Sequence, residues 1–128
     1  MPPRPRGGPN APLDASGLSR DPAVIEAYEN DPLVHDRVSA RFFTEFLAAM
    51  ESVRQMAPAI KTPLMLQLAG DDHLVNTQTS KKFFELLALK DKTLYVYDGL
   101  YHEIYNELED QRQVVLNDLE NWVVNHLA

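Results

Sequence analysis

The sequence contains no cysteine among its 128 residues. A disulfide framework, a thiolate metal site and a cysteine nucleophile are therefore excluded, and this composition favours a reducing compartment such as the cytoplasm. Basic residues are also scarce, because 12 Lys and Arg stand against 19 Asp and Glu and the formal net charge is −7. Nucleic-acid binding draws most of its affinity from clustered Lys and Arg, so we expect no nucleic-acid partner.

Long apolar runs are missing as well. No stretch approaches the roughly 18 apolar residues of a membrane-spanning helix, and residues 1–8 lack the apolar stretch of a secretory signal. We therefore expect a soluble protein without a membrane span. With 45% hydrophobic residues, the chain has enough apolar side chains for the core of one compact domain.

Proline and glycine are concentrated at the start of the chain. Five of the nine prolines and the Gly7-Gly8 pair precede Asp14. Proline restricts the backbone and glycine makes it flexible, but a segment of this composition has almost no apolar side chains to bury. We expect residues 1–13 to form a flexible arm rich in Pro, Gly and Arg, to which no function is assigned.

Two helices are predicted before residue 60. Asp21 can cap the first, with Pro22 at its first position, and the segment 30–32, Asn-Asp-Pro, would end it. The second helix should begin near Asp36 or Ser39, because apolar residues then recur every three or four positions. Those residues are Val38, Phe42, Phe43, Phe46, Met50 and Val53.

The spacing of apolar residues changes after residue 63. Leu64–Ala69 is a nearly continuous apolar run that stops at Gly70, as a strand covered on both faces would. Asn76 or Thr77 can cap a helix after it, and Thr93–Tyr97 predicts a second strand. Strand, helix and strand make one βαβ unit of a parallel sheet.

A last helix is predicted from about Asp110 to His126. Its apolar residues share one stripe, which would cover one face of the sheet. That stripe consists of Val115, Leu119, Trp122, Val123 and Leu127. The sequence thus predicts an α/β fold in which a helical segment, residues 14–60, precedes a βαβα unit, residues 61–128.

Polar residues follow both predicted strands. The first loop holds Asp71, Asp72 and His73, and the second holds His102 and Glu103. Right-handed crossovers bring both loops to the same edge of a parallel sheet, where ligands bind in open α/β folds. A carboxylate there can orient His102 as a general base by accepting a hydrogen bond from one ring nitrogen.

The spacing Gly70-x-Asp72-x-x-Val75, followed by His102, resembles the acid and histidine loops of serine α/β-hydrolases. Over about residues 10–127 the chain resembles the monoacylglycerol lipase and lysophospholipase group of that superfamily. The stretches that carry this likeness are Leu18-Ser19-Arg20-Asp21, Tyr28-Glu29-Asn30-Asp31-Pro32-Leu33, Asp91-Lys92-Thr93-Leu94 and Tyr97-Asp98-Gly99-Leu100-Tyr101-His102-Glu103.

This resemblance implies a carboxylic ester hydrolase that acts on lipid-like acyl esters, such as monoacylglycerols or lysophospholipids. Asp72 would orient His102, and a serine would attack the carbonyl carbon. Asp71 is the alternative acid, but Asp72 occupies the motif position.

No cofactor is implied, and a metal site is not expected, because the segment after His102 lacks the second His of a zinc-binding helix. Surface roles are expected for the remaining histidines, His35, His73 and His126. Glu103 and Glu107 are expected to be solvated or structural.

The resemblance also implies that residues 14–60 form a helical cap over the active site and that residues 61–128 are the carboxyl-terminal part of the hydrolase core. Phe42, Phe43 and Phe46 would line or support an acyl pocket, with ordinary packing of the cap on the core as the alternative. Two further residues match positions near the substrate in the family, Tyr28 and Leu74.

The chain departs from the family pattern in lacking a Gly-x-Ser-x-Gly elbow and a His-Gly oxyanion segment. We expect both to lie upstream of Met1, in a missing amino-terminal half of the same fold, and we expect the chain alone to be inactive. A fragment, a truncated reading frame and one piece of a split enzyme all fit this pattern. The rival functions are another α/β-hydrolase chemistry (peptidase, dehalogenase or epoxide hydrolase) and a non-catalytic remnant or binding module.

Overall fold

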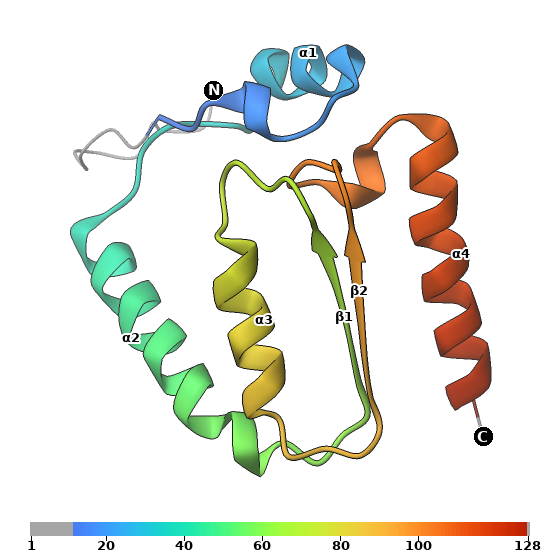
Figure 1. Ribbon diagram of the computed structural model, residues 1–128. Helices are drawn as coiled ribbons and strands as arrows, with labels where there is room; N and C mark the ends of the chain where they lie inside the picture. Colours follow the sequence, from blue (N-terminus) through green and yellow to red (C-terminus); the bar gives the residue numbers. More distant parts are fainter. Residues whose placement is uncertain (1–11, 128) are drawn as a thin grey trace.

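The computed structural model describes residues 12–127 of the chain (Figure 1). The predicted arm, residues 1–13, lies almost entirely outside this part. Helices come first and a strand-helix-strand-helix order follows, as predicted. In chain order the elements are a 3₁₀ helix at Ala15–Gly17, α1 (Pro22–Asn30), α2 (Ala40–Met56), a 3₁₀ helix at Ala57–Ala59, β1 (Leu64–Ala69), α3 (Thr77–Leu86), β2 (Lys92–Tyr97), a 3₁₀ helix at Ile104–Asn106 and α4 (Glu109–His126).

The two strands are parallel neighbours in one sheet. Leu64 lies opposite Lys92 at one end of the pair, and Ala69 lies opposite Tyr97 at the other. α3 runs along one side of the strands and α4 along the other (Figure 1). Because both strands run in the same direction, the loops after Ala69 and Tyr97 emerge at the same edge of the sheet.

Polar side chains cap α1, α2 and α3, whereas no side chain caps α4. Asp21 accepts a hydrogen bond from a backbone amide in the first turn of α1. Of the two candidates for α2, Ser39 is the cap and Asp36 is not. Asn76, not Thr77, caps α3 in the same way. These local hydrogen bonds fix where α1, α2 and α3 begin.

The apolar stripe of α4, which was predicted to cover one face of the sheet, is only partly buried. Val115 is fully buried in a cluster with Ala69, Leu100 and Ile104, whereas Leu127 is 73% exposed. Leu127 follows His126, the last residue of α4, and so lies beyond the end of the helix.

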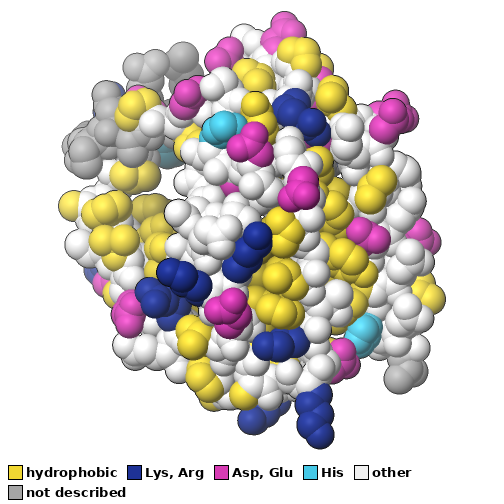
Figure 2. Space-filling model, in the orientation of Figure 1, with side chains coloured by type: hydrophobic (Ala, Val, Ile, Leu, Met, Phe, Trp, Pro, Cys, Tyr) yellow, Lys and Arg dark blue, Asp and Glu magenta, His cyan; other side chains and the backbone are white. Residues whose placement is uncertain are grey.

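The apolar residues of α2 also remain exposed. Figure 2 shows hydrophobic side chains on the outer surface of α2, at the left of the view, and a second group over the middle of the molecule between α3 and α4. Phe42 and Phe43 are each 56% exposed and Phe46 is 52% exposed. None of the helices in residues 12–127 combines the length and the apolar content that a membrane crossing requires.

Gly70 follows β1 at the point where the chain approaches β2 most closely. Its amide donates to the carbonyl of Tyr97 at 2.8 Å, and a Cβ atom at this position would lie 2.7 Å from that oxygen and 2.8 Å from Cα of Asp98. We expect Gly70→Ala to lower the free energy of unfolding by about 3 kcal/mol, because backbone atoms after both strands would have to move. Denaturant unfolding of the chain measures this loss.

Gly99→Ala is the matched control. Gly99 has φ +73, and a Cβ atom there would meet nothing within 4 Å. Alanine at this position therefore costs only the strain of a left-handed backbone, about 1–2 kcal/mol. A loss at Gly70 no larger than the loss at Gly99 would contradict the close approach of the two strands.

His126 joins the last turn of α4 to the start of β2. Its Nδ1 donates to the carbonyl of Trp122 at 2.6 Å, and its Nε2 lies 3.1 Å from Oδ1 of Asp91. The hydrogen bond to Trp122, followed by the interaction with Asp91, raises the pKa of His126 above its ordinary value of 6.5. The protonated ring, which donates from both nitrogens, is thus the form that the fold stabilises.

The stability that His126 contributes should depend on pH. Because its pKa is higher in the folded than in the unfolded chain, the contribution is complete below about pH 6.5 and is lost as the pH rises through the folded pKa. We expect Asp91→Asn to lower the free energy of unfolding at about pH 5.5 and to have little effect at about pH 8.5. Glu120→Gln, an exposed change on α4, is the control. An effect of Asp91→Asn that is equal at both pH values would disprove the pairing.

Candidate active site

Asp72 lies in the loop after β1, and amides of the same loop hold its carboxylate. Oδ1 accepts hydrogen bonds from the amides of Leu74 and Val75, both at 2.8 Å, while Oδ2 is the oxygen nearest His102. The side chain is only 10% exposed. Burial raises the pKa of Asp72, but the hydrogen bonds from His102 and from the two amides outweigh it and hold the pKa below its ordinary value. The carboxylate is therefore ionised at neutral pH.

His102 lies in the loop after β2, and its ring contacts this carboxylate. Nδ1 of His102 is 2.9 Å from Oδ2 of Asp72, and the side chain of His102 is 37% exposed. An ionised carboxylate can only accept a hydrogen bond, so Nδ1 carries a proton and Nε2 of the neutral ring is an acceptor. The structure thus brings together the two residues that the sequence singles out, in the arrangement of a general base whose tautomer is fixed by an acid.

A cavity of about 350 Å³ adjoins this pair. Asp72 and His102 both line it, together with residues of β1, the start of α3 and the 3₁₀ helix that follows His102. Three residues that carry a hydroxyl group are among those that line it, namely Thr77, Ser80 and Tyr105. Its volume is in the range of small-molecule sites, so the imidazole borders a space that can hold a reacting group.

Asp71 and His73 form a separate pair. Nε2 of His73 is 3.7 Å from Oδ2 of Asp71, and both side chains are about half exposed, at 49% and 60%. The ring of His73 also packs edge-on against Tyr101, with ring centroids 4.5 Å apart. The structure therefore pairs Asp72, and not Asp71, with His102.

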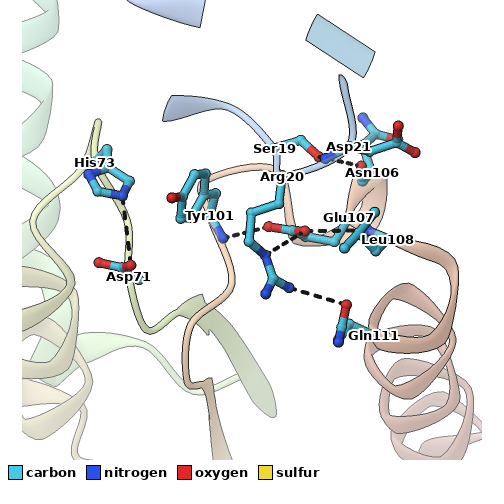
Figure 3. A network of polar contacts seen from close by, with 10 residues as sticks. All are labelled: Ser19, Arg20, Asp21, Asp71, His73, Tyr101, Asn106, Glu107, Leu108 and Gln111. Carbon is cyan, nitrogen blue, oxygen red and sulfur yellow. Dashed lines mark hydrogen bonds and ion pairs between the residues drawn. The ribbon is translucent and has the colours of Figure 1, made fainter. Parts of the chain in front are cut away.

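Glu107 is not solvated, which corrects one of the two expectations for this residue. Its side chain is fully buried and lies 3.1 Å from Nε of Arg20. Figure 3 shows the carboxylate of Glu107 between Arg20 and the backbone of Tyr101, well apart from the Asp71–His73 pair. Sequence reasoning missed this ion pair, and its one signal was that Arg20 belongs to a stretch that resembles the family.

The five residues expected near the substrate do not line the cavity beside His102. Leu74 contacts Asp72 through its backbone amide, and its side chain borders a second cavity of about 280 Å³ with His73 and Tyr101. The others lie on the two helices before β1, where Tyr28 is partly buried in α1 and the three phenylalanines are exposed on α2. A role in substrate binding stays a prediction for all five, which are Tyr28, Phe42, Phe43, Phe46 and Leu74.

Metal ligands do not gather in the part of the chain that the structure describes. No group of three or more His, Asp and Glu side chains in residues 12–127 is arranged to hold a metal ion. The polar residues that do converge are an acid and an imidazole beside a cavity. That set suits proton transfer and activation of a hydroxyl nucleophile.

Comparisons with known proteins point to one family. The model of the family described as serine aminopeptidase, S33, matches residues 3–109. Among curated proteins, a monoacylglycerol lipase of Mycolicibacterium smegmatis is 38% identical over 116 residues, which cover 90% of this chain and 41% of the relative. The phospholipase YtpA of Bacillus subtilis is 43% identical over 100 residues, which cover 73% of this chain and 39% of the relative. The chain thus spans about two fifths of the length of these curated relatives.

A solved structure agrees with the sequence relatives. The crystal structure of the Paleococcus ferrophilus monoacylglycerol lipase superimposes with a TM-score of 0.86 at 34% identity, covering 91% of this chain and 45% of that chain. The predicted resemblance and the predicted α/β-hydrolase fold class are confirmed. The chain belongs to the serine aminopeptidase S33 family of α/β-hydrolases and is a monoacylglycerol lipase-like member of it.

Proposed function

We propose that Asp72 and His102 supply the acid and the base of a Ser-Asp-His triad in a carboxylic ester hydrolase. The observation that carries this proposal is the 2.9 Å contact between Nδ1 of His102 and Oδ2 of Asp72 beside a cavity. In this scheme Nε2 of His102 takes the proton of a serine hydroxyl as the serine attacks the ester carbonyl. Asp72 stabilises the resulting imidazolium, which then protonates the departing alcohol.

The serine is proposed to come from polypeptide outside these 128 residues. The sequence holds no Gly-x-Ser-x-Gly elbow, and the matching part of the Mycolicibacterium smegmatis lipase is 41% of that protein. A triad without its nucleophile and oxyanion donors loses both covalent attack and charge stabilisation. The 128-residue chain alone should therefore be inactive as an esterase.

A monoacylglycerol or a lysophospholipid is the proposed substrate. The names of the relatives support this choice, since they are monoacylglycerol lipases and a phospholipase. The exposed apolar residues of α2 support it too, because an acyl chain needs an apolar surface. We propose that α1 and α2 form the cap. Residues 17–20 contact the segment 98–108 after β2, called the histidine loop because it contains His102, and we propose that they belong with the core. The family description favours a peptidase as the second candidate.

A chimera tests the proposed reaction. In it, this chain replaces the matching 116 residues of the Mycolicibacterium smegmatis monoacylglycerol lipase, and the rest of that lipase is expected to supply the serine elbow. The chimera should hydrolyse a monoacylglycerol, with a burst of alcohol release that marks an acyl-enzyme. Peptide turnover without ester turnover would support the second candidate. A folded chimera with neither activity would overturn the proposal.

A further inference from the structure

The buried carboxylate of Glu107 is paired with a cation, and both of its oxygens accept hydrogen bonds. A buried ionised carboxylate is unfavourable unless it is paired and its oxygens accept hydrogen bonds. Here Oε1 accepts from the amide of Tyr101 at 2.7 Å. Oε2 accepts from Nε of Arg20 at 3.1 Å and from the amide of Leu108 at 3.3 Å. The carboxylate therefore holds the backbone of Tyr101, the residue directly before His102.

Arg20 brings a second segment into the same contact. Nη2 of Arg20 donates to Oε1 of Gln111 at 3.2 Å, in the first turns of α4. The ion pair thus connects three pieces of chain, which are the segment before α1, the loop after β2 and the start of α4 (Figure 3). A lysine could supply the charge but not both donors of the planar guanidinium.

The residues just before Arg20 run along the histidine loop. The carbonyl of Gly17 accepts from the amide of His102 at 3.4 Å, and the carbonyl of Leu18 accepts from the amide of Glu103 at 2.8 Å. Ser19, which is 1% exposed, donates its hydroxyl to the carbonyl of Asn106 at 2.8 Å. The backbone of His102 is therefore held from outside its own loop.

The carboxylate of Asp72, in contrast, accepts hydrogen bonds from amides of its own loop, those of Leu74 and Val75. The two partners of the proposed acid–base pair thus have different supports. The support of His102 includes a contact between segments far apart in the sequence, because Arg20 and Glu107 are 87 residues apart.

We propose that Arg20 and Glu107 are a positioning pair that sets the orientation of the His102 imidazole toward Asp72. They contact no reacting atom; they act through the backbone of Tyr101 and His102. The kinetic part of this proposal rests on the proposed function, whereas the orientation of the ring can be measured without turnover. The pair also fastens the start of α1 to the histidine loop, since Asp21 caps that helix and directly follows Arg20.

The decisive variants are Glu107→Gln and Arg20→Lys in the chimera, with the exposed Glu109→Gln as control. Glutamine keeps an oxygen for the amide of Tyr101 but removes the charge that pairs with Arg20. Misplacing a general base by a fraction of an ångström to about 1 Å costs roughly tenfold to a hundredfold in kcat. We expect such a loss in both variants with little change in KM, and no loss in Glu109→Gln.

The ring of His102 provides a second readout. In the unaltered chimera the NMR chemical shifts of the two His102 ring nitrogens should report a proton on Nδ1, held by Asp72. In Glu107→Gln they should report a mixture of tautomers. If a single variant fails to fold, the double variant Arg20→Gln/Glu107→Gln replaces it, because no buried charge is then left unpaired.

The outcomes separate this inference from the proposed function. Lower melting temperatures with unchanged kcat and unchanged ring shifts would mean a purely structural ion pair and would overturn the inference. If the unaltered chimera has no turnover, the proposed function fails, and the ring shifts alone decide about positioning. A ring that keeps its tautomer in Glu107→Gln then overturns the inference as well.

Discussion

Replacing His102 with Ala in the chimera should lower kcat by roughly 10⁶, because removing the base of a serine triad costs about as much as removing the whole triad. The imidazole is the group that must take the serine proton and return it to the departing alcohol. Nothing else among the described residues contacts Asp72 in the same way, so no second base can replace it. Steady-state hydrolysis of a monoacylglycerol by the purified variant measures the loss.

His73→Ala is the control for this variant. His73 lies one residue after Asp72, but its contacts are with Asp71 and Tyr101. We expect a change in kcat of a few-fold at most, as for an exposed ion pair with little energetic weight. Large, equal losses of kcat in the two variants would mean that disturbing the loops, rather than removing the imidazole of His102, lowers kcat.

Asp72→Asn in the same chimera should lower kcat by roughly 10⁴ while the fold survives. An amide at this position can donate to Nδ1 and thereby hold the ring in the wrong tautomer, with the proton on Nε2. It also removes the negative charge that stabilises the imidazolium in the transition state. Asn can keep the hydrogen bonds that Oδ1 accepts from the amides of Leu74 and Val75, so the loop should retain its shape.

Asp71→Asn is the matched control for Asp72→Asn. Its carboxylate is 60% exposed and pairs only loosely with His73, so we expect a loss of about tenfold or less. Melting temperatures of the two variants should agree with that of the unaltered chimera, so that lost folding is not mistaken for lost chemistry. If Asp71→Asn were the crippled variant, the pairing seen here would not be the one that operates during turnover.

Local features made most of the fold predictable from the sequence. Helix starts depend on one capping side chain and its neighbouring amides, and Asp21 caps α1 as predicted. The apolar run Leu64–Ala69 and the Gly70 that ends it defined β1 to the residue. Parallel strands with right-handed crossovers bring the loops after them to one edge, so the meeting of Asp72 and His102 also followed from the pattern.

Features that depend on distant parts of the chain could not be predicted in this way. Arg20 and Glu107 are 87 residues apart, and nothing in the local sequence of Glu107 distinguishes a buried carboxylate from a solvated one. Periodicity showed which face of α4 is apolar but not how much of it the sheet covers, and Leu127 remained exposed. The exposure of the phenylalanines on α2 could not be predicted either. The spacing of apolar residues shows which face of a helix is apolar, but the neighbouring elements determine whether that face is covered.

The central claim is that Asp72 and His102 activate a serine that these 128 residues do not contain. The most direct test is labelling with a fluorophosphonate, which reacts covalently with activated serines, followed by mass spectrometry of the labelled peptide. We predict that the chain alone is not labelled, that the chimera is labelled at the serine of its elbow, and that His102→Ala abolishes the labelling. A labelled serine within this chain, or labelling of the chimera that survives His102→Ala, would contradict the claim.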